Sequence, residues 1–181
     1  MRKLLCVIFL AVLLCFTFAC QNKAEKAELE KFRSQAKLEE QNKEIVKRFV
    51  AEFNKGNLEI FNKLCAPDYS YYVPSNSLKP YSREEQIEAE KMMRRAFPDV
   101  NLRVEKLFAV EDSVVIRGVA TGTHQGEFQG IQATGNKIEF SNIIIMSLRN
   151  GIIVEAREES NMFGFMEQLG MELRPKEAEK K

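Results

Sequence analysis

The chain has 181 residues, which is enough for one domain of ordinary size with appendages at its ends. It contains 27 Lys and Arg against 26 Asp and Glu, so it lacks the basic excess that a general nucleic-acid binder needs. The single His excludes zinc sites built on several histidines, and nine Gly and five Pro are too few for a low-complexity chain. We therefore expect a globular domain with no metal site and no nucleic-acid partner.

The N-terminus is predicted to be a signal peptide, at residues 1–19. Arg2 and Lys3 supply positive charge before an uninterrupted apolar run over 4–19, which ends in the small Ala19. This run is shorter than the roughly 20 residues that a transmembrane helix needs. Charge, apolar run and small residue in this order are typical of a secretory signal.

The next residue, Cys20, resembles the acylated cysteine of bacterial lipoproteins. Thr17 and Phe18 depart from that pattern, which usually has Leu and then a small residue at these positions. We expect an exported protein, lipid-anchored to a bacterial membrane of the cell envelope, and several acyl chains would make this attachment durable. Ordinary cleavage near Ala19 and an uncleaved anchor are the alternatives.

Cysteine usage agrees with export. Cys6 and Cys15 belong to the predicted signal peptide and Cys20 would be acylated, so Cys65 remains without a disulfide partner. Because Cys65 ends a helical pattern, a small buried apolar role is favoured over that of a nucleophile.

The rest of the chain divides into three parts. Residues 20–38 carry five positive and three negative side chains without Pro or Gly, and they are predicted to form a charged tether. A partner-binding helix that uses Leu29 and Phe32 is the alternative. The folded domain is placed at 39–173 and a disordered charged tail at 174–181.

Helices are predicted in the first half of the domain. Apolar residues at helical spacing predict a helix that ends at Gly56, and a short helix follows over 58–65. A strand is predicted over 69–73. Ser82 with Glu85 forms a capping-box pattern, which opens a helix ending at Pro98.

Strands dominate the second half. Asn150-Gly151 is a strong hairpin signal between two of them, and a final short helix is predicted over 162–169. Helices followed by an antiparallel meander predict an α+β fold, with helices on one face of the sheet. The long strands are predicted over 100–110, 113–123, 137–149 and 152–160.

Four short segments resemble the SnoaL-like polyketide cyclase (ester cyclase) family. They are AFPD at 96–99, GTHQGEFQGIQATG at 122–135, GIIVE at 151–155 and QLG at 168–170. They occur in the family's order, and the resemblance extends over roughly 39–173.

This resemblance implies a cone-shaped nuclear transport factor two-like (cystatin-like) fold. In that fold, N-terminal helices pack on a curved antiparallel sheet around an internal pocket, and members often form homodimers through the open sheet face. The implied chemistry is acid/base conversion of a small hydrophobic molecule without metal or cofactor, as in the aldol closure of a polyketide ring. Fold alone does not transfer that activity, so the site residues decide it.

The family's acid/base Asp falls on Asn161, and the Trp before it falls on Arg157. An amide cannot exchange a proton near neutral pH. We therefore expect Asn161 either to orient a substrate carbonyl or to cap the final helix.

Alternation along the last strand predicts that Ile153, Glu155, Arg157 and Glu159 share one face. If that face lines the pocket, Glu155 or Glu159 is a candidate base, whose pKa burial would raise and Arg157 would lower. The alternative is a row of ion pairs on a solvated surface or at a dimer contact.

Three further positions follow from the resemblance. His124 stands where the family has a pocket histidine, so it is a candidate catalytic residue, with a structural histidine as the alternative. Tyr71 stands where many members have a second His and could donate a hydrogen bond to a substrate. Phe128 and Ile131 are expected to close one end of the pocket.

Three functions remain open. The first is an enzyme of cyclase, isomerase or hydrolase type that uses His124 with Glu155 or Glu159. The second is a binding module that captures an apolar ligand without converting it, because Asn161 replaces the acid/base Asp. The third is an interaction domain whose sheet face pairs with a partner or with itself.

Overall fold

The computed structural model describes residues 2–172 and 174, with side chains for 23, 25–172 and 174. The chain divides into two compact units, Met1–Leu38 and Glu39–Lys181. The predicted signal peptide and Cys20 lie outside the residues whose side chains are described, and the predicted tail lies outside them except for Arg174. Within the described residues, no helix is both long enough and apolar enough to cross a membrane.

The first helix, α1, runs from Arg2 to Asn54 and takes part in both units. In the first unit its Leu29 and Phe32 are exposed. In the second unit its apolar face is buried, since Val46 and Phe49 belong to the core. Gly56 follows the helix with a φ of +79°, a left-handed conformation that glycine adopts without strain, so the predicted stop is confirmed.

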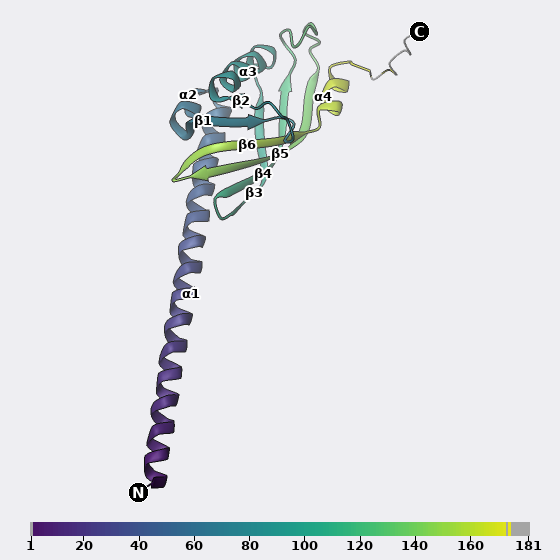
Figure 1. Cartoon of the computed structure of the whole chain (residues 1–181). Coiled ribbons are helices and arrows are strands. Elements are labelled where there is room, and N and C mark those ends of the chain that lie inside the picture. Colours follow the sequence, from purple (N-terminus) through teal and green to yellow (C-terminus); the bar gives the residue numbers. More distant parts are fainter. Residues whose placement is uncertain (1, 173, 175–181) are drawn as a thin grey trace, which may run out of the picture. The chain divides into compact units, whose positions relative to one another are not determined.

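The second unit is built on one curved six-stranded sheet with the order β2-β1-β6-β5-β4-β3 (Figure 1). The long strands β3 to β6 form an antiparallel meander, as predicted, and β1 joins it parallel to β6. The α+β prediction is confirmed, with the difference that the sheet is mixed. The strands are β1 (Cys65–Tyr72), β2 (Tyr81–Ser82), β3 (Asn101–Val110), β4 (Ser113–Thr123), β5 (Lys137–Arg149) and β6 (Ile152–Ser160).

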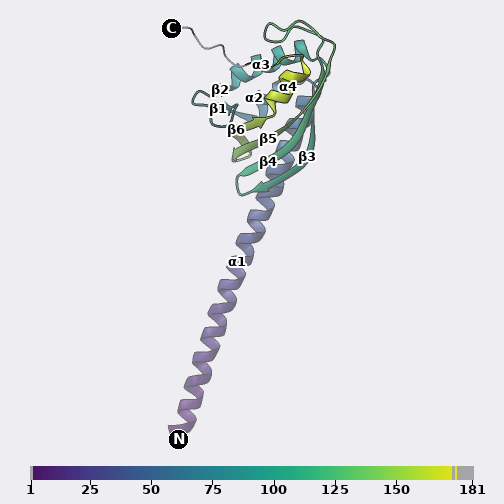
Figure 2. The same cartoon turned by 90° about the vertical axis from the view of Figure 1, so that its right-hand side faces the viewer.

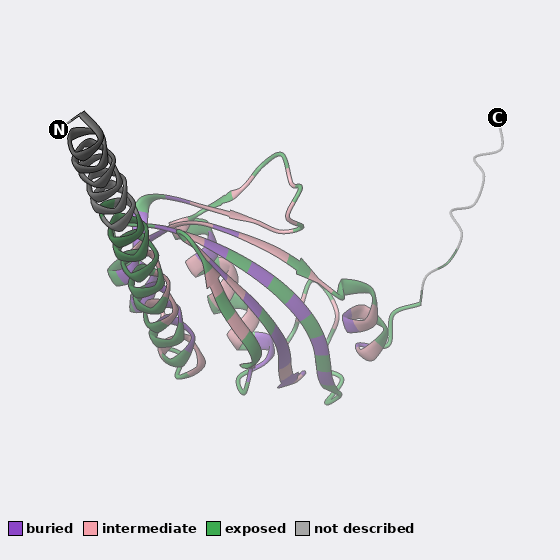
Figure 3. Ribbon diagram, turned by 90° about the horizontal axis from the view of Figure 1, so that it is seen from below, coloured by how far each residue is buried: buried purple, intermediate pink, exposed green. Residues whose placement is uncertain are grey.

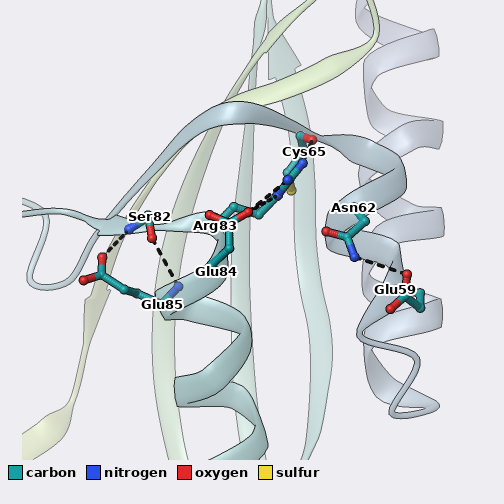
Figure 4. A network of polar contacts seen from close by, with 7 residues as sticks. All are labelled: Glu59, Asn62, Cys65, Ser82, Arg83, Glu84 and Glu85. Atoms are coloured by element: carbon teal, nitrogen blue, oxygen red, sulfur yellow. Dashed lines mark hydrogen bonds and ion pairs between the residues drawn. The ribbon is translucent and has the colours of Figure 1, made fainter.

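Three shorter helices complete this unit: α2 (Glu59–Leu64), α3 (Arg83–Ala96) and α4 (Met162–Gln168). The predicted capping box opens α3, because the Ser82 hydroxyl accepts from the backbone of Glu85 and the Glu85 carboxylate accepts from the backbone of Ser82. In Figure 4 the Arg83 side chain reaches back to the Cys65 carbonyl at 3.4 Å, which ties the start of α3 to β1.

The inner side of the sheet faces the helices, and the strands bend strongly around them (Figure 2). Along β5 every second residue is buried and the residues between are exposed, apart from the half-buried Ser147, which gives the striped strand of Figure 3. The buried residues form two separate clusters. One joins α1 and α2 to the middle of the sheet and includes Phe49, Phe61 and Ile144, and the other joins α3 to α4 and includes Phe97, Phe140 and Phe165.

One irregularity in β6 decides which of its side chains face inward. Ser147 of β5 pairs with Glu155, but the next residue, Leu148, pairs with Ile153. Val154 is therefore an extra residue, a β-bulge, and it reverses the alternation of every residue after it. Ile153 and Ala156 are both fully buried as a result.

Candidate functional site

A cavity of about 920 Å³ lies between the two clusters of the second unit. It is enclosed by the inner face of the sheet, α1, α3 and the loop that follows β4. Its wall is mainly apolar and rich in aromatic rings, which is typical of sites for small organic molecules. The aromatic side chains include Phe49, Phe53, Phe61, Tyr69, Tyr71 and Phe140.

A carboxylate from β6, that of Glu158, lines this cavity. It accepts a hydrogen bond from the Tyr71 hydroxyl at 2.7 Å and one from the Asn142 amide at 3.4 Å. The hydroxyl of Ser160 also donates to it. Three donors from three places in the sheet therefore fix the orientation of the Glu158 carboxylate.

A second carboxyl group, that of Glu90, lines the cavity from α3. Burial and the nearby charge of Glu158 raise the pKa of Glu90 to about 7, although Arg94 and a hydrogen bond from Gln86 act in the opposite direction. Near neutral pH this carboxyl is therefore present both with and without its proton. Groups of this kind are suited to general acid/base chemistry.

Two buried amide oxygens on the cavity wall have no hydrogen-bond partner within the described part of the chain. They are Gln86 Oε1 and Asn142 Oδ1, in side chains that are 7% and 6% exposed. Buried polar atoms are rarely left without a partner, because each costs free energy. Both oxygens have almost no accessible surface, so they are buried within the wall and do not face the cavity, and Asn142 Oδ1 packs against Gly118 of β4.

The two tyrosines of β1 that line the cavity remain neutral at physiological pH. Burial raises the pKa of Tyr69 and of Tyr71 well above the usual value, and the charge of Glu158 raises both further. Neither hydroxyl is therefore a base, and Tyr71 acts as a hydrogen-bond donor to Glu158.

His124 does not line the cavity but lies in the second core cluster. Its side chain is 0% exposed and its ring stacks on Phe97 with centroids 5.0 Å apart. The Thr134 backbone donates to Nδ1 at 3.3 Å, and the Thr134 hydroxyl lies 3.0 Å from the same nitrogen. The geometry thus corresponds to the structural alternative and does not bring His124 together with a carboxyl group of the cavity.

The three charged residues of β6 that were predicted for the pocket, Glu155, Arg157 and Glu159, are also absent from its wall. The expected alternation is wrong after Ile153, because the bulge at Val154 turns these side chains to the opposite face. The inward positions are instead taken by Ala156 and Glu158.

These three outer side chains hold the segment after β1. Arg157 pairs with Glu155 at 2.7 Å and donates to the Ser75 carbonyl at 2.7 Å, while its guanidinium lies 4.0 Å from the Tyr72 ring centroid. Glu159 accepts from the backbone of Ser75 at 3.1 Å. This arrangement corresponds to the outer-surface alternative for Glu155 and Arg157, which form an ion pair, whereas Glu159 is held by hydrogen bonds from Ser75.

Of the remaining predicted positions, Tyr71 and Phe128 line the cavity and Asn161 and Ile131 do not. Asn161 caps α4, because its side-chain oxygen accepts from the Gly164 backbone at 3.0 Å, so the capping alternative is confirmed. Ile131 pairs with Phe128 through backbone hydrogen bonds and packs on the second cluster.

The remaining thiol, that of Cys65, is buried, and burial raises its pKa to about 12. It is therefore protonated at neutral pH, and the predicted buried role is confirmed. No three His, Cys, Asp or Glu side chains gather as a metal site in the described residues.

Sequence reasoning missed the two carboxyl groups that do line the cavity. For Glu90 a signal was present, since it lies on the same helical face as Gln86 and Met93, at spacings of four and three residues. For Glu158 no local signal existed, because the bulge that turns it inward depends on pairing with β5.

Comparison with known proteins supports the family predicted from the motifs. Residues 44–169 match the SnoaL-like polyketide cyclase family. The chain also resembles AclR from Streptomyces galilaeus, a structure described as that of a candidate hydroxylase, at 31% identity and a TM-score of 0.66, over 71% of this chain and 95% of that one. No curated protein matches the chain in sequence.

Two further solved structures have the same fold. IdmH from Streptomyces antibioticus, described as a candidate polyketide cyclase, is 28% identical with a TM-score of 0.63, over 72% of this chain and 99% of that one. A candidate SnoaL-like polyketide cyclase from Jannaschia sp. CCS1 is 22% identical with a TM-score of 0.67, over 75% and 96% of the two chains. By motif order, matched length and fold, the chain belongs to the SnoaL-like polyketide cyclase family.

Proposed function

We propose that the second unit binds a small hydrophobic molecule in its cavity and converts it by cofactor-free acid/base chemistry of the cyclase, isomerase or hydrolase type. The observation that carries this proposal is the pair of carboxyl groups, Glu90 and Glu158, on the wall of an otherwise mainly apolar cavity of about 920 Å³. The likeness to IdmH, whose description names a polyketide cyclase, supports conversion of a small organic molecule.

The two carboxyl groups have environments that suit different roles. Glu158 is held by three hydrogen-bond donors and is suited to orienting a substrate or stabilising positive charge. Glu90, with a pKa of about 7, can take a proton from one substrate atom and return it to another. In this proposal Glu90 takes the place of the Asp that Asn161 replaces.

Native mass spectrometry of the purified full chain, after exposure to a lysate of its own cells, tests the proposal. We expect a retained small molecule on the wild type and none on Ala89→Trp, because Ala89 lines the cavity from α3 and a large ring there fills it. Once the molecule is identified, Glu90→Gln should slow its conversion by about 100-fold or more. A molecule that is retained but not converted would favour a binding module. A chain that retains no molecule would contradict both binding and conversion.

The exposed face of the sheet supports a second proposal, that two copies of the chain pair through it. Phe108, Ile143 and Ile145 are 50%, 48% and 42% exposed there. Phe108 of β3 and Ile145 of β5 lie on either side of β4, because both pair with Val115. The same mass spectra measure this pairing. We expect the wild type to have the mass of two chains and Ile143→Asp to have the mass of one. The same mass for both proteins would contradict pairing through this face.

We further propose that the protein is exported and anchored by acyl chains on Cys20. The support is the sequence alone, with its charged start, its apolar run over 4–19 and the cysteine that follows. Growing cells with labelled palmitate should label the wild type and leave Cys20→Ser unlabelled. Equal labelling of the two chains, or none in the wild type, would exclude this anchor.

A further inference from the structure

The polar atoms on the interior wall of the cavity are mostly hydrogen-bond acceptors. They include the carboxyl groups of Glu90 and Glu158. The Tyr71 hydroxyl is a donor, but it is already engaged with Glu158 at 2.7 Å. A molecule that donates hydrogen bonds therefore complements these two carboxyl groups.

The charged residues of the cavity wall favour a ligand of the same kind. Among the charged residues that line the cavity, Arg95 and Glu127 are exposed, whereas Glu90 and Glu158 are half-buried in its interior. Arg94 lies close enough to act on Glu90, but its guanidinium stacks over the Phe53 ring at 4.7 Å and it does not line the cavity. The interior thus holds negative charge that the protein compensates only in part.

The aromatic rings around these carboxyl groups favour a positive charge as well. Phe49, Phe53, Phe61 and Phe140 present rings to the cavity. The face of an aromatic ring attracts cations, and more strongly where water is excluded. Carboxylates among aromatic rings are thus complementary to a positively charged group attached to an apolar body.

We infer that the cavity takes a hydrophobic amine, whose ammonium group lies at the carboxyl groups of Glu90 and Glu158. This inference rests on the proposed binding of a small molecule in the cavity, and it names the chemical class of that molecule. A neutral alcohol of the same shape leaves the negative charge of Glu158 uncompensated. A carboxylic acid adds a like charge, which is unfavourable in a site of low dielectric constant.

Three fluorescent anthracenes that differ only in the substituent on the central ring test the inference: the aminomethyl, the hydroxymethyl and the carboxylic acid derivatives. In fluorescence titrations of the full chain at neutral pH, the amine should bind about tenfold more tightly than the alcohol. The acid should bind most weakly. Glu158→Gln should weaken binding of the amine about tenfold and leave binding of the alcohol within about threefold.

The controls separate this inference from the proposed function. Glu155→Gln removes a carboxylate on the opposite face of β6 and should leave all three affinities unchanged, whereas Ala89→Trp should weaken all three. Circular dichroism checks that each variant is folded. Equal binding of amine and alcohol would overturn the amine inference while the cavity still binds a small molecule. If none of the three binds, or if Ala89→Trp changes nothing, the proposed binding fails as well.

Discussion

Replacing Phe165 by Ala is expected to lower the free energy of unfolding by about 3–5 kcal/mol. Phe165 is 0% exposed and fixes α4 to the second core cluster. Its ring centroid lies 5.0 Å from that of Phe140, 5.5 Å from that of Phe128 and 5.7 Å from that of Phe97. Truncation removes these contacts and leaves a void that the neighbouring rings cannot fill without moving.

Urea denaturation followed by circular dichroism measures this loss. Phe163 on the same helix is the matched control, because it is 50% exposed, and Phe163→Ala should cost less than about 1 kcal/mol. Similar losses for the two variants would mean that α4 does not pack on the sheet through Phe165.

Replacing Glu90 by Gln is expected to stabilise the protein at alkaline pH. The pKa of Glu90 is raised from 4.5 to about 7 in the folded chain, so the folded state binds more protons than the unfolded state between these values. The stability of the wild type therefore falls as the pH rises through this window. Above it, Glu90→Gln should be more stable than the wild type by about 2–3 kcal/mol.

Urea denaturation at about pH 4 and at about pH 8 tests this expectation. The two proteins should have similar stability at the lower pH and differ at the higher one. Glu88 on the same helix is the matched control, since its carboxylate is exposed and pairs with Lys91 at 2.6 Å. Glu88→Gln should change stability by less than about 1 kcal/mol at either pH. If the free energies of unfolding of the wild type and Glu90→Gln differ by the same amount at both pH values, the pKa of Glu90 is not raised by folding.

The order and type of the main elements could be predicted because the sequence determines them locally. Ser82 and Glu85 place the start of α3, and Asn150-Gly151 places the turn between β5 and β6, where both residues have positive φ. The parallel pairing of β1 with β6 could not be predicted in this way. Its two strands are far apart in the chain, and nothing local distinguishes a parallel from an antiparallel neighbour.

The candidate site was harder to predict because it depends on one inserted residue. Strict alternation placed Glu155 and Glu159 toward the pocket. The bulge at Val154 reverses which side chains of the strand face inward, and it brings Glu158 there instead. His124 shows a different limit, because the motif that contains it identifies the family but not the direction of its side chain. Tyr71 and Phe128 do line the cavity, in segments that the resemblance to the family placed at the pocket.

The division of the buried residues into two clusters has a consequence for how long the protein survives. Residues of both clusters line the cavity, so a molecule bound there as proposed would touch both. Any molecule that binds only the folded state stabilises it by mass action, in proportion to the logarithm of its concentration. Supply of the ligand would therefore set the fraction of chains that open far enough for proteases to cut, and the abundance of the protein would follow the availability of the molecule that it binds.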